Sequence, residues 1–197
     1  LGVIVLEAIN IPRLDYLTIG GNPFLLVEPQ KTNTATFSEE FDNAAWFKFN
    51  STIIVNQIAA PNNTLSADLL TVTASPGFLA IFSSWTTQTK TASIFVKKAT
   101  SDIFNIDNAS TGGSGVTFNI LTGVVVAQQS GFVGKIEAFK DGWYRCSATH
   151  TAPSNQTLSF QLPSLNDSVY VWGAQLEDGS FATSYIPTTN SAVTRNE

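Results

Sequence analysis

The chain has 197 residues and a mass of 21.2 kDa, which is enough for one domain with a core of its own. Only 13% of its residues are charged, and 15 acidic against 10 basic residues give a net charge of -5. Such a chain has no cationic surface for a phosphate backbone, so nucleic acid is not an expected partner. A single cysteine and a single histidine exclude an internal disulfide and the usual His/Cys zinc sites.

The first 35 residues predict an extended N-terminal arm. Proline and glycine interrupt every candidate strand in this part, at 11–13, 20–23 and 28–30. The apolar run at the start is followed at once by Glu7 and is too short to span a bilayer, so neither a signal peptide nor membrane insertion is expected. The sequence contains no methionine, which indicates a segment of a longer polypeptide or a processed product.

Residues 36–187 predict an all-β fold, an antiparallel jelly-roll β-sandwich. Short apolar or alternating runs follow one another along this part, among them 78–82, 92–96, 123–126, 158–162 and 168–172. Clusters of Gly, Pro and Asn separate them, as expected of turns. The one candidate for a short helix is 38–46. Many short strands without intervening helices are typical of sandwiches and jelly rolls.

The end of the chain predicts a strap that closes the sandwich. The stretch YVWGAQLEDGSFATSYIPTT, residues 170–189, begins as a strand, turns at Asp178 and Gly179, and continues as a segment held extended by Pro187. Tyr185 and Ile186 are its candidate anchors. Residues 188–197 are polar and predict a connector.

Several stretches together carry a resemblance to a known family. They read PRLDY and LLVEPQKTN (12–16 and 25–33), FSEEFDNAAWFK (37–48), FNILTG (118–123), IEAFKDGWYRCS (136–147) and VYVWGAQLEDGSFATSYIPTTNSAVTR (169–195). In this order they resemble a domain of bacteriophage tail, fibre and other virion-surface proteins, related in fold to jelly-roll carbohydrate-binding modules.

The resemblance implies a non-catalytic domain in an extracellular setting, on the surface of a virion. Its implied partners are other virion proteins and the polysaccharide of the host cell surface, and by analogy with phage fibres we expect a homotrimer. A purely structural spacer or assembly module without a ligand is the alternative that this resemblance leaves open.

The tryptophans divide into two groups. Trp46, Trp143 and Trp172 lie within strand-like motifs, and we expect them to pack in the core, as we do the lone Cys146. Trp85 lies among Ser, Thr and Gln. An indole in such a setting either binds the flat face of a sugar ring or packs on the sandwich edge or the arm.

The stretch SDIFNIDNAS, residues 101–110, contains candidate groups for binding sugar hydroxyls. Asn105, Asp107 and Asn108 would serve if they alternate outward from one strand. The alternative is a solvated edge strand, kept polar to prevent pairing with other chains.

Acidic residues at 39, 40 and 42 resemble the place where related carbohydrate-binding jelly rolls hold a structural calcium ion, with Glu40 as the candidate ligand. The partner strand in those modules offers adjacent aspartates, whereas this chain has Gly173, Ala174 and Gln175 there. No cofactor other than this ion is considered. No strand carries the carboxylate row of concanavalin-like glycosidases, and no Ser/His/Asp set or phosphate loop occurs, so we do not expect an enzyme.

Overall fold

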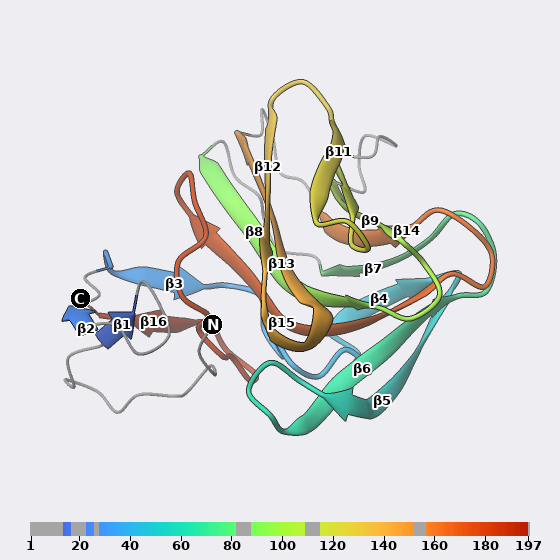
Figure 1. The fold of residues 1–197 in the computed structure, drawn as a ribbon, viewed down its shortest axis with the longest axis horizontal. Helices are drawn as coiled ribbons and strands as arrows, with labels where there is room; N and C mark the ends of the chain where they lie inside the picture. The colour runs from blue at the N-terminus through green and yellow to red at the C-terminus, as the bar shows by residue number, and fades with distance from the viewer. Residues whose placement is uncertain are drawn as a thin grey trace.

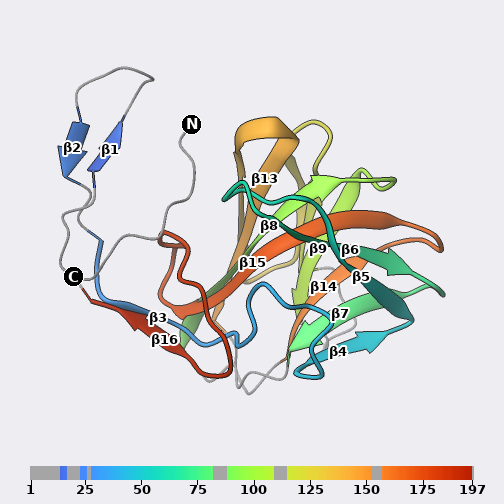
Figure 2. The ribbon, with the colours of Figure 1, turned by 90° about the horizontal axis from the view of Figure 1, so that it is seen from below.

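The computed structural model describes residues 14–16, 23–25, 28–81, 88–108, 115–151 and 157–196. Regular structure in these residues is β throughout, apart from one 3-10 turn at Lys140–Gly142. Two six-stranded antiparallel sheets pack face to face, as Figures 1 and 2 show in two views. The predicted antiparallel jelly-roll β-sandwich is confirmed. Within the described residues there is no helix with the length and apolar character that crossing a bilayer requires.

We name each sheet by a central strand. The β9 sheet has the order β11-β10-β9-β14-β7-β4, and the β8 sheet has the order β12-β13-β8-β15-β6-β5. The strands of the β9 sheet are β4 (Trp46–Phe49), β7 (Gly77–Ile81), β9 (Ile103–Asn108), β10 (Val116–Asn119), β11 (Val124–Gln128) and β14 (Leu158–Leu162). The strands of the β8 sheet are β5 (Ser51–Ala59), β6 (Leu65–Val72), β8 (Thr89–Lys98), β12 (Phe132–Ala138), β13 (Trp143–Thr151) and β15 (Ser168–Asp178).

The main core lies between the two sheets. Alternation along each strand directs one set of side chains inward, such as Phe104 and Ile106 of β9 and Ile94 of β8, all fully buried. Trp46 lies in this core against Phe160, with ring centroids 5.9 Å apart. The free thiol of Cys146 is also fully buried there, and burial raises its pKa.

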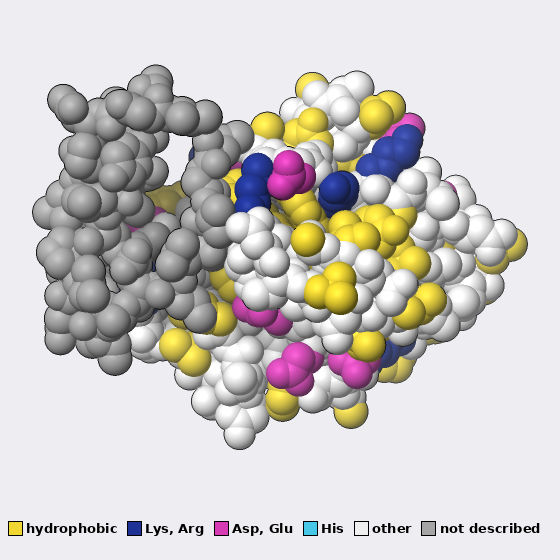
Figure 3. Space-filling model, turned by 60° about the horizontal axis from the view of Figure 1, so that its bottom comes forward, with side chains coloured by type: hydrophobic (Ala, Val, Ile, Leu, Met, Phe, Trp, Pro, Cys, Tyr) yellow, Lys and Arg dark blue, Asp and Glu magenta, His cyan; other side chains and the backbone are white. Residues whose placement is uncertain are grey.

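On the face that Figure 3 shows, charged side chains are few and lie among apolar and uncharged polar ones.

Trp143 and Trp172 are buried as predicted, but in a second cluster on the other side of the β8 sheet. Phe95 joins them, together with Ala60 and Ala67. This cluster lies on the outer face of the sheet, because Phe95 alternates with the inward-facing Ile94 and Val96. The domain therefore has aromatic packing on both sides of the β8 sheet.

The segment at 38–46 is a series of turns, so the expected short helix is wrong. The backbone N–H groups of Glu40, Asn43 and Trp46 donate to the carbonyl groups three residues earlier. Side chains take backbone donors that a helix would use: Asn43 Oδ1 accepts from Ala45 N, and Asp68 Oδ2 accepts from Phe41 N. Such local bonds compete with helix formation.

Short strands connect the predicted arm with the predicted connector. In the arm, β1 (Leu14–Tyr16) pairs with β2 (Pro23–Leu25). β3 (Lys31–Asn33) pairs with β16 (Val193–Arg195), and Figure 2 shows these two strands side by side. Asn33 is fully buried, and its Nδ2 donates to the carbonyl oxygens of Ala174 (3.0 Å) and Ile186 (2.7 Å). Residues 31–35 thus lie against their own sandwich, and the domain boundaries stay a prediction.

Candidate functional site

The outer face of the β9 sheet brings two predicted binding residues together. Asn105 and Asp107 alternate with the core residues Phe104 and Ile106, so they lie on the face opposite the core. β9 lies between β10 and β14. The alternative interpretation, a solvated edge strand, is therefore wrong for β9.

Cross-strand pairing aligns Asn105 with a row of side chains that crosses all six strands. Its members, in order from β4 to β11, are Phe49, Phe78, Gln161, Asn105, Thr117 and Ala127. We call this the cross-sheet row. A shorter second row runs beside it and consists of Phe47, Ala80, Ser159 and Asp107. The second row is buried except for Phe47, whereas the cross-sheet row is open at both ends.

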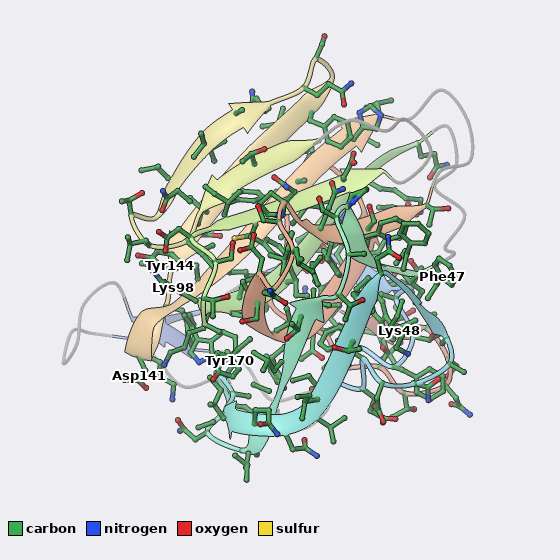
Figure 4. The ribbon with its side chains drawn as sticks, turned by 90° about the vertical axis from the view of Figure 1, so that its right-hand side faces the viewer. Phe47, Lys48, Lys98, Asp141, Tyr144 and Tyr170 are labelled. Atoms are coloured by element: carbon green, nitrogen blue, oxygen red, sulfur yellow. The ribbon has the colours of Figure 1, made fainter. Side chains whose placement is uncertain are left out.

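Phenylalanine rings form one end of this face. Phe47 and Phe49 are 43% and 40% exposed, and Phe49 stacks on Phe78 with ring centroids 5.0 Å apart. The ring centroids of Phe47 and Phe78 are 6.3 Å apart. Phe47 projects from β4 at the margin of the molecule, as Figure 4 shows. The rings give the β4 end of the row an apolar, accessible surface.

The middle of the cross-sheet row contains a buried acceptor. Asn105 is 5% exposed, and among the groups that the structure describes its Oδ1 has no hydrogen-bond partner. A buried polar atom left without a partner costs about 1–3 kcal/mol, and native proteins contain few of them. Gln161 and Thr117 are its half-buried neighbours in the row. The face therefore offers a place where a donor from a ligand would be stabilising.

The outer face of the β8 sheet is covered by the chain's own strap, residues 180–189. Tyr185 packs on Trp172 with ring centroids 4.7 Å apart, and Ile186 is 3% exposed. Gly173 makes this approach possible: its φ of 66° lies in the left-handed region, and a Cβ there would lie 3.3 Å from the Tyr185 ring. Phe95 contacts Tyr185 from the neighbouring strand.

Polar groups under the strap are mostly paired within the chain. Glu177, fully buried, accepts hydrogen bonds from Thr183 N at 3.1 Å and from Thr183 Oγ1 at 3.3 Å. Among the described residues, two donors there, Trp172 Nε1 and Arg145 Nε, have no hydrogen-bond partner. Burial raises the pKa of Glu39, and the nearby indole of Trp172 lowers it by a smaller amount. The Arg145 guanidinium donates through Nη2 to Ser93 Oγ. This face is occupied and is not a candidate site.

The predicted site residues are distributed as follows. Asn105 and Asp107 share the outer face of the β9 sheet. Asn108 ends β9 opposite Leu158, and its side chain lies outside the described part of the structure, as does all of Trp85. Their role in binding stays a prediction.

Sequence reasoning missed the phenylalanines and Gln161. The stretch WFKF alternates with period 2, so a buried Trp46 already implies that Phe47 and Phe49 lie on the opposite face. No local pattern could have shown that Gln161 lies beside Asn105, because the two are 56 positions apart in the chain.

The acidic residues proposed for calcium have other surroundings. Glu39 accepts a hydrogen bond from Tyr185 Oη at 3.0 Å, while Glu40 and Asp42 are exposed. Gln175, at the position of the partner strand, accepts from Ile186 N at 2.7 Å. Within the described residues no three His, Cys, Asp or Glu side chains come together as metal ligands. These residues do not fit a calcium site as they lie, and the calcium hypothesis stays to be tested by chelation.

Comparison with known proteins gives a structural likeness but no family. No family model and no curated protein matches the chain. Among solved structures it is similar to the CBM22-1–GH10 modules of the Clostridium thermocellum N-terminal endo-1,4-β-D-xylanase 10B, complexed with xylohexaose. The TM-score is 0.48 and the identity 14%, over 81% of this chain and 30% of that chain. A likeness of this degree says nothing about a ligand.

Proposed function

We propose that this chain is a non-catalytic binding domain that holds a glycan across the outer face of the β9 sheet. The observation that carries the proposal is Oδ1 of Asn105, which has no partner among the described residues and is buried in the middle of a row with accessible phenylalanine at one end. An apolar platform beside a few fixed polar groups is the usual composition of a small-molecule site.

The chemistry of the row suits a sugar chain. Aromatic faces such as that of Phe49 pack on the C–H surfaces of pyranose rings, and amides such as Asn105 and Gln161 exchange hydrogen bonds with hydroxyl groups. Five strand-to-strand spacings of about 4.8 Å make the row about 24 Å long, which suits an extended chain of several sugars rather than a monosaccharide. Weak affinity at each site would be multiplied where many copies are displayed together.

Trp85 and Asn108 remain part of this proposal. Residue 85 follows Ile81, the last residue of β7, by four positions, and Ile81 pairs with Leu158, the partner of Asn108. We therefore expect both residues to lie near the end of the β9 sheet that carries Asp107. We expect Trp85 to supply a further ring face beside the second row.

A glycan array of host surface polysaccharides tests the proposal on the whole chain. We expect Phe49→Ala and Asn105→Ala each to weaken binding about tenfold, equivalent to about 1.4 kcal/mol. Phe181→Ala is the matched control, because Phe181 is 52% exposed and lies beyond the end of β15, outside the β9 sheet. Equal binding by all four proteins would overturn the proposed site.

We place this binding domain on a virion surface, most simply as a homotrimer. What supports the setting is the resemblance to phage tail and fibre domains of the stretches at 12–16, 25–33, 37–48, 118–123, 136–147 and 169–195. Since residues 31–35 lie against their own sandwich, we assign contacts between copies to residues 1–27.

Removal of residues 1–27 tests the assembly. The deletion spares Glu28, whose carboxylate accepts from Ser184 N at 2.8 Å and pairs with Arg195 at 3.2 Å. In sedimentation velocity we expect a trimer for the whole chain and a folded monomer for the deletion. A whole chain that sediments as a monomer contradicts the trimer.

A structural spacer without ligand is the second candidate function. It is favoured by exposed valines on the edge strands: Val124 (48%) and Val126 (56%) of β11, and Val133 (64%) of β12. A neighbouring subunit would cover such an apolar strip. This function predicts no glycan on the array, and loss of assembly in Val126→Lys.

A further inference from the structure

We infer that the glycan bound on the β9 sheet carries no acidic groups, so that chains with carboxylate or sulfate are rejected. The inference rests on the proposed function and adds the class of ligand. It follows from the distribution of charge over the outer face and from the kind of atom that lacks a partner there.

No basic side chain faces the ligand from the six strands. Lys48 of β4 is the single Lys or Arg in these strands. It pairs with the core residue Leu79, on the inner side of the sheet, and its Nζ donates to the carbonyl oxygens of Asp42 and Asn43, both at 2.7 Å. Lys48 is therefore directed away from the cross-sheet row.

The segments that join these strands to their neighbours bring no cation either. Residues 82–87 read FSSWTT, 109–114 read ASTGGS and 152–156 read APSNQ, without a charged residue. They follow directly on Ile81, Asn108 and Thr151, the ends of β7, β9 and β13. An acidic sugar bound on this face would thus meet no Lys or Arg from the strands or from these segments, although Arg and Lys are the residues that recognise carboxylate and sulfate.

Asp107 adds a carboxyl group at the same place. It lies in the second row, two positions along β9 from Asn105, and is 4% exposed. If this carboxyl is ionised, it repels a carboxylate of the ligand, because little water screens charges at a buried position.

The Oδ1 atom of Asn105, which has no partner among the described residues, also disfavours an acidic group at this place. Oδ1 of Asn105 is an acceptor and needs a donor from the ligand. A hydroxyl or an acetamido N–H supplies one, whereas an ionised carboxylate or sulfate cannot. Asn105 therefore favours a ligand that has a hydroxyl or N–H donor, and no acidic group, at this point of the row.

Affinity electrophoresis with matched polysaccharides tests the inference. The probes are neutral xylan, galactomannan and dextran, and acidic polygalacturonate, alginate and hyaluronan, each acid also after chemical reduction of its carboxyl groups. Reduction changes the charge and leaves the linkages intact. We expect at least one neutral or reduced chain to retard the protein, and the acidic parent of a retarding reduced chain to bind at least tenfold more weakly.

Two variants separate charge from folding. The measured quantity is the affinity for a reduced chain divided by the affinity for its acidic parent. Asp107→Asn should lower this ratio and Asn105→Asp should raise it. Asp141→Asn, at an exposed residue of the 3-10 turn, is the control and should leave the ratio unchanged. Melting temperatures show which variants fold. Binding of an acidic parent as tight as that of its reduced form overturns the inference and leaves the proposed function standing. No retardation by any probe overturns both.

Discussion

The outer faces of both sheets carry aromatic and polar side chains, but the chain itself covers these side chains on only one of the two faces. On the β8 sheet, aromatic rings and buried polar groups are closed over by the strap, with Tyr185 packed on Trp172. On the β9 sheet, Phe49 remains 40% exposed and Asn105 Oδ1 remains without a partner among the described residues. On the β8 sheet, the strap covers the aromatic rings and pairs with the side-chain amide of Gln175, so that face has no room for a ligand. The β9 face is accessible at the Phe49 and Ala127 ends of the cross-sheet row, and the acceptor at its centre has no partner within the described residues, which is why we assign the ligand to it.

The largest expected difference between the faces is in stability. Trp143→Ala should lower the free energy of unfolding by about 3–5 kcal/mol, because it removes a large side chain that is 1% exposed. Phe49→Ala on the open face should cost less than about 1 kcal/mol. Urea denaturation followed by circular dichroism measures both. An unchanged midpoint for Trp143→Ala would show that the second cluster does not hold the fold together.

The strap should contribute a moderate amount through its hydroxyl contacts. Tyr185→Phe keeps the ring against Trp172 and removes the bonds to Ser38 Oγ at 2.6 Å and to Glu39 Oε1 at 3.0 Å. We expect a loss of about 0.5–1.5 kcal/mol for each bond removed. Glycan binding should not change. Weaker binding in this variant would place the ligand on the β8 sheet instead.

The smallest expected effect is the pH dependence of stability that Glu39, beside the strap, causes. Burial raises the pKa of the Glu39 carboxyl, against the lowering effect of bonds from Tyr185 and Trp172. The folded state therefore holds this proton more tightly than the unfolded state, and stability falls as pH rises from the ordinary value of 4.5 through the raised one. Glu39→Gln should stabilise the protein at about pH 7 and have less effect at about pH 4, as read from melting temperatures. A constant difference would contradict the assigned shift.

Local pattern was sufficient for some of the structure and insufficient for the rest. Alternation predicted the strands, which depend on neighbours in sequence. The motif that contains Trp46 predicted its burial, and Trp46 is buried. It could not place β9 in the sheet interior, because β14, some 50 positions further on, inserts between β7 and β9. The turns at 38–46 were misread because Asp68, distant in sequence, binds Phe41 N.

The tryptophans show the same limit. Their motifs predicted burial for Trp143 and Trp172, and both are buried. That their face of the β8 sheet is covered depends on the strap, whose Tyr185 packs on Trp172 beside the bulge at Gly173. The candidate site was half predictable: β9 supplied Asn105 and Asp107, while the row they belong to depends on pairing between distant strands.

Amide chemical-shift mapping tests the central claim most directly. The ¹⁵N-labelled chain is titrated with a soluble oligosaccharide of the polysaccharide that the array identifies. We predict the largest shifts at five members of the cross-sheet row, 49, 78, 105, 117 and 161, and none above background at the strap, 180–189. Shifts concentrated on the strap and β15, with the cross-sheet row unchanged, would contradict the assignment of the ligand to the β9 sheet.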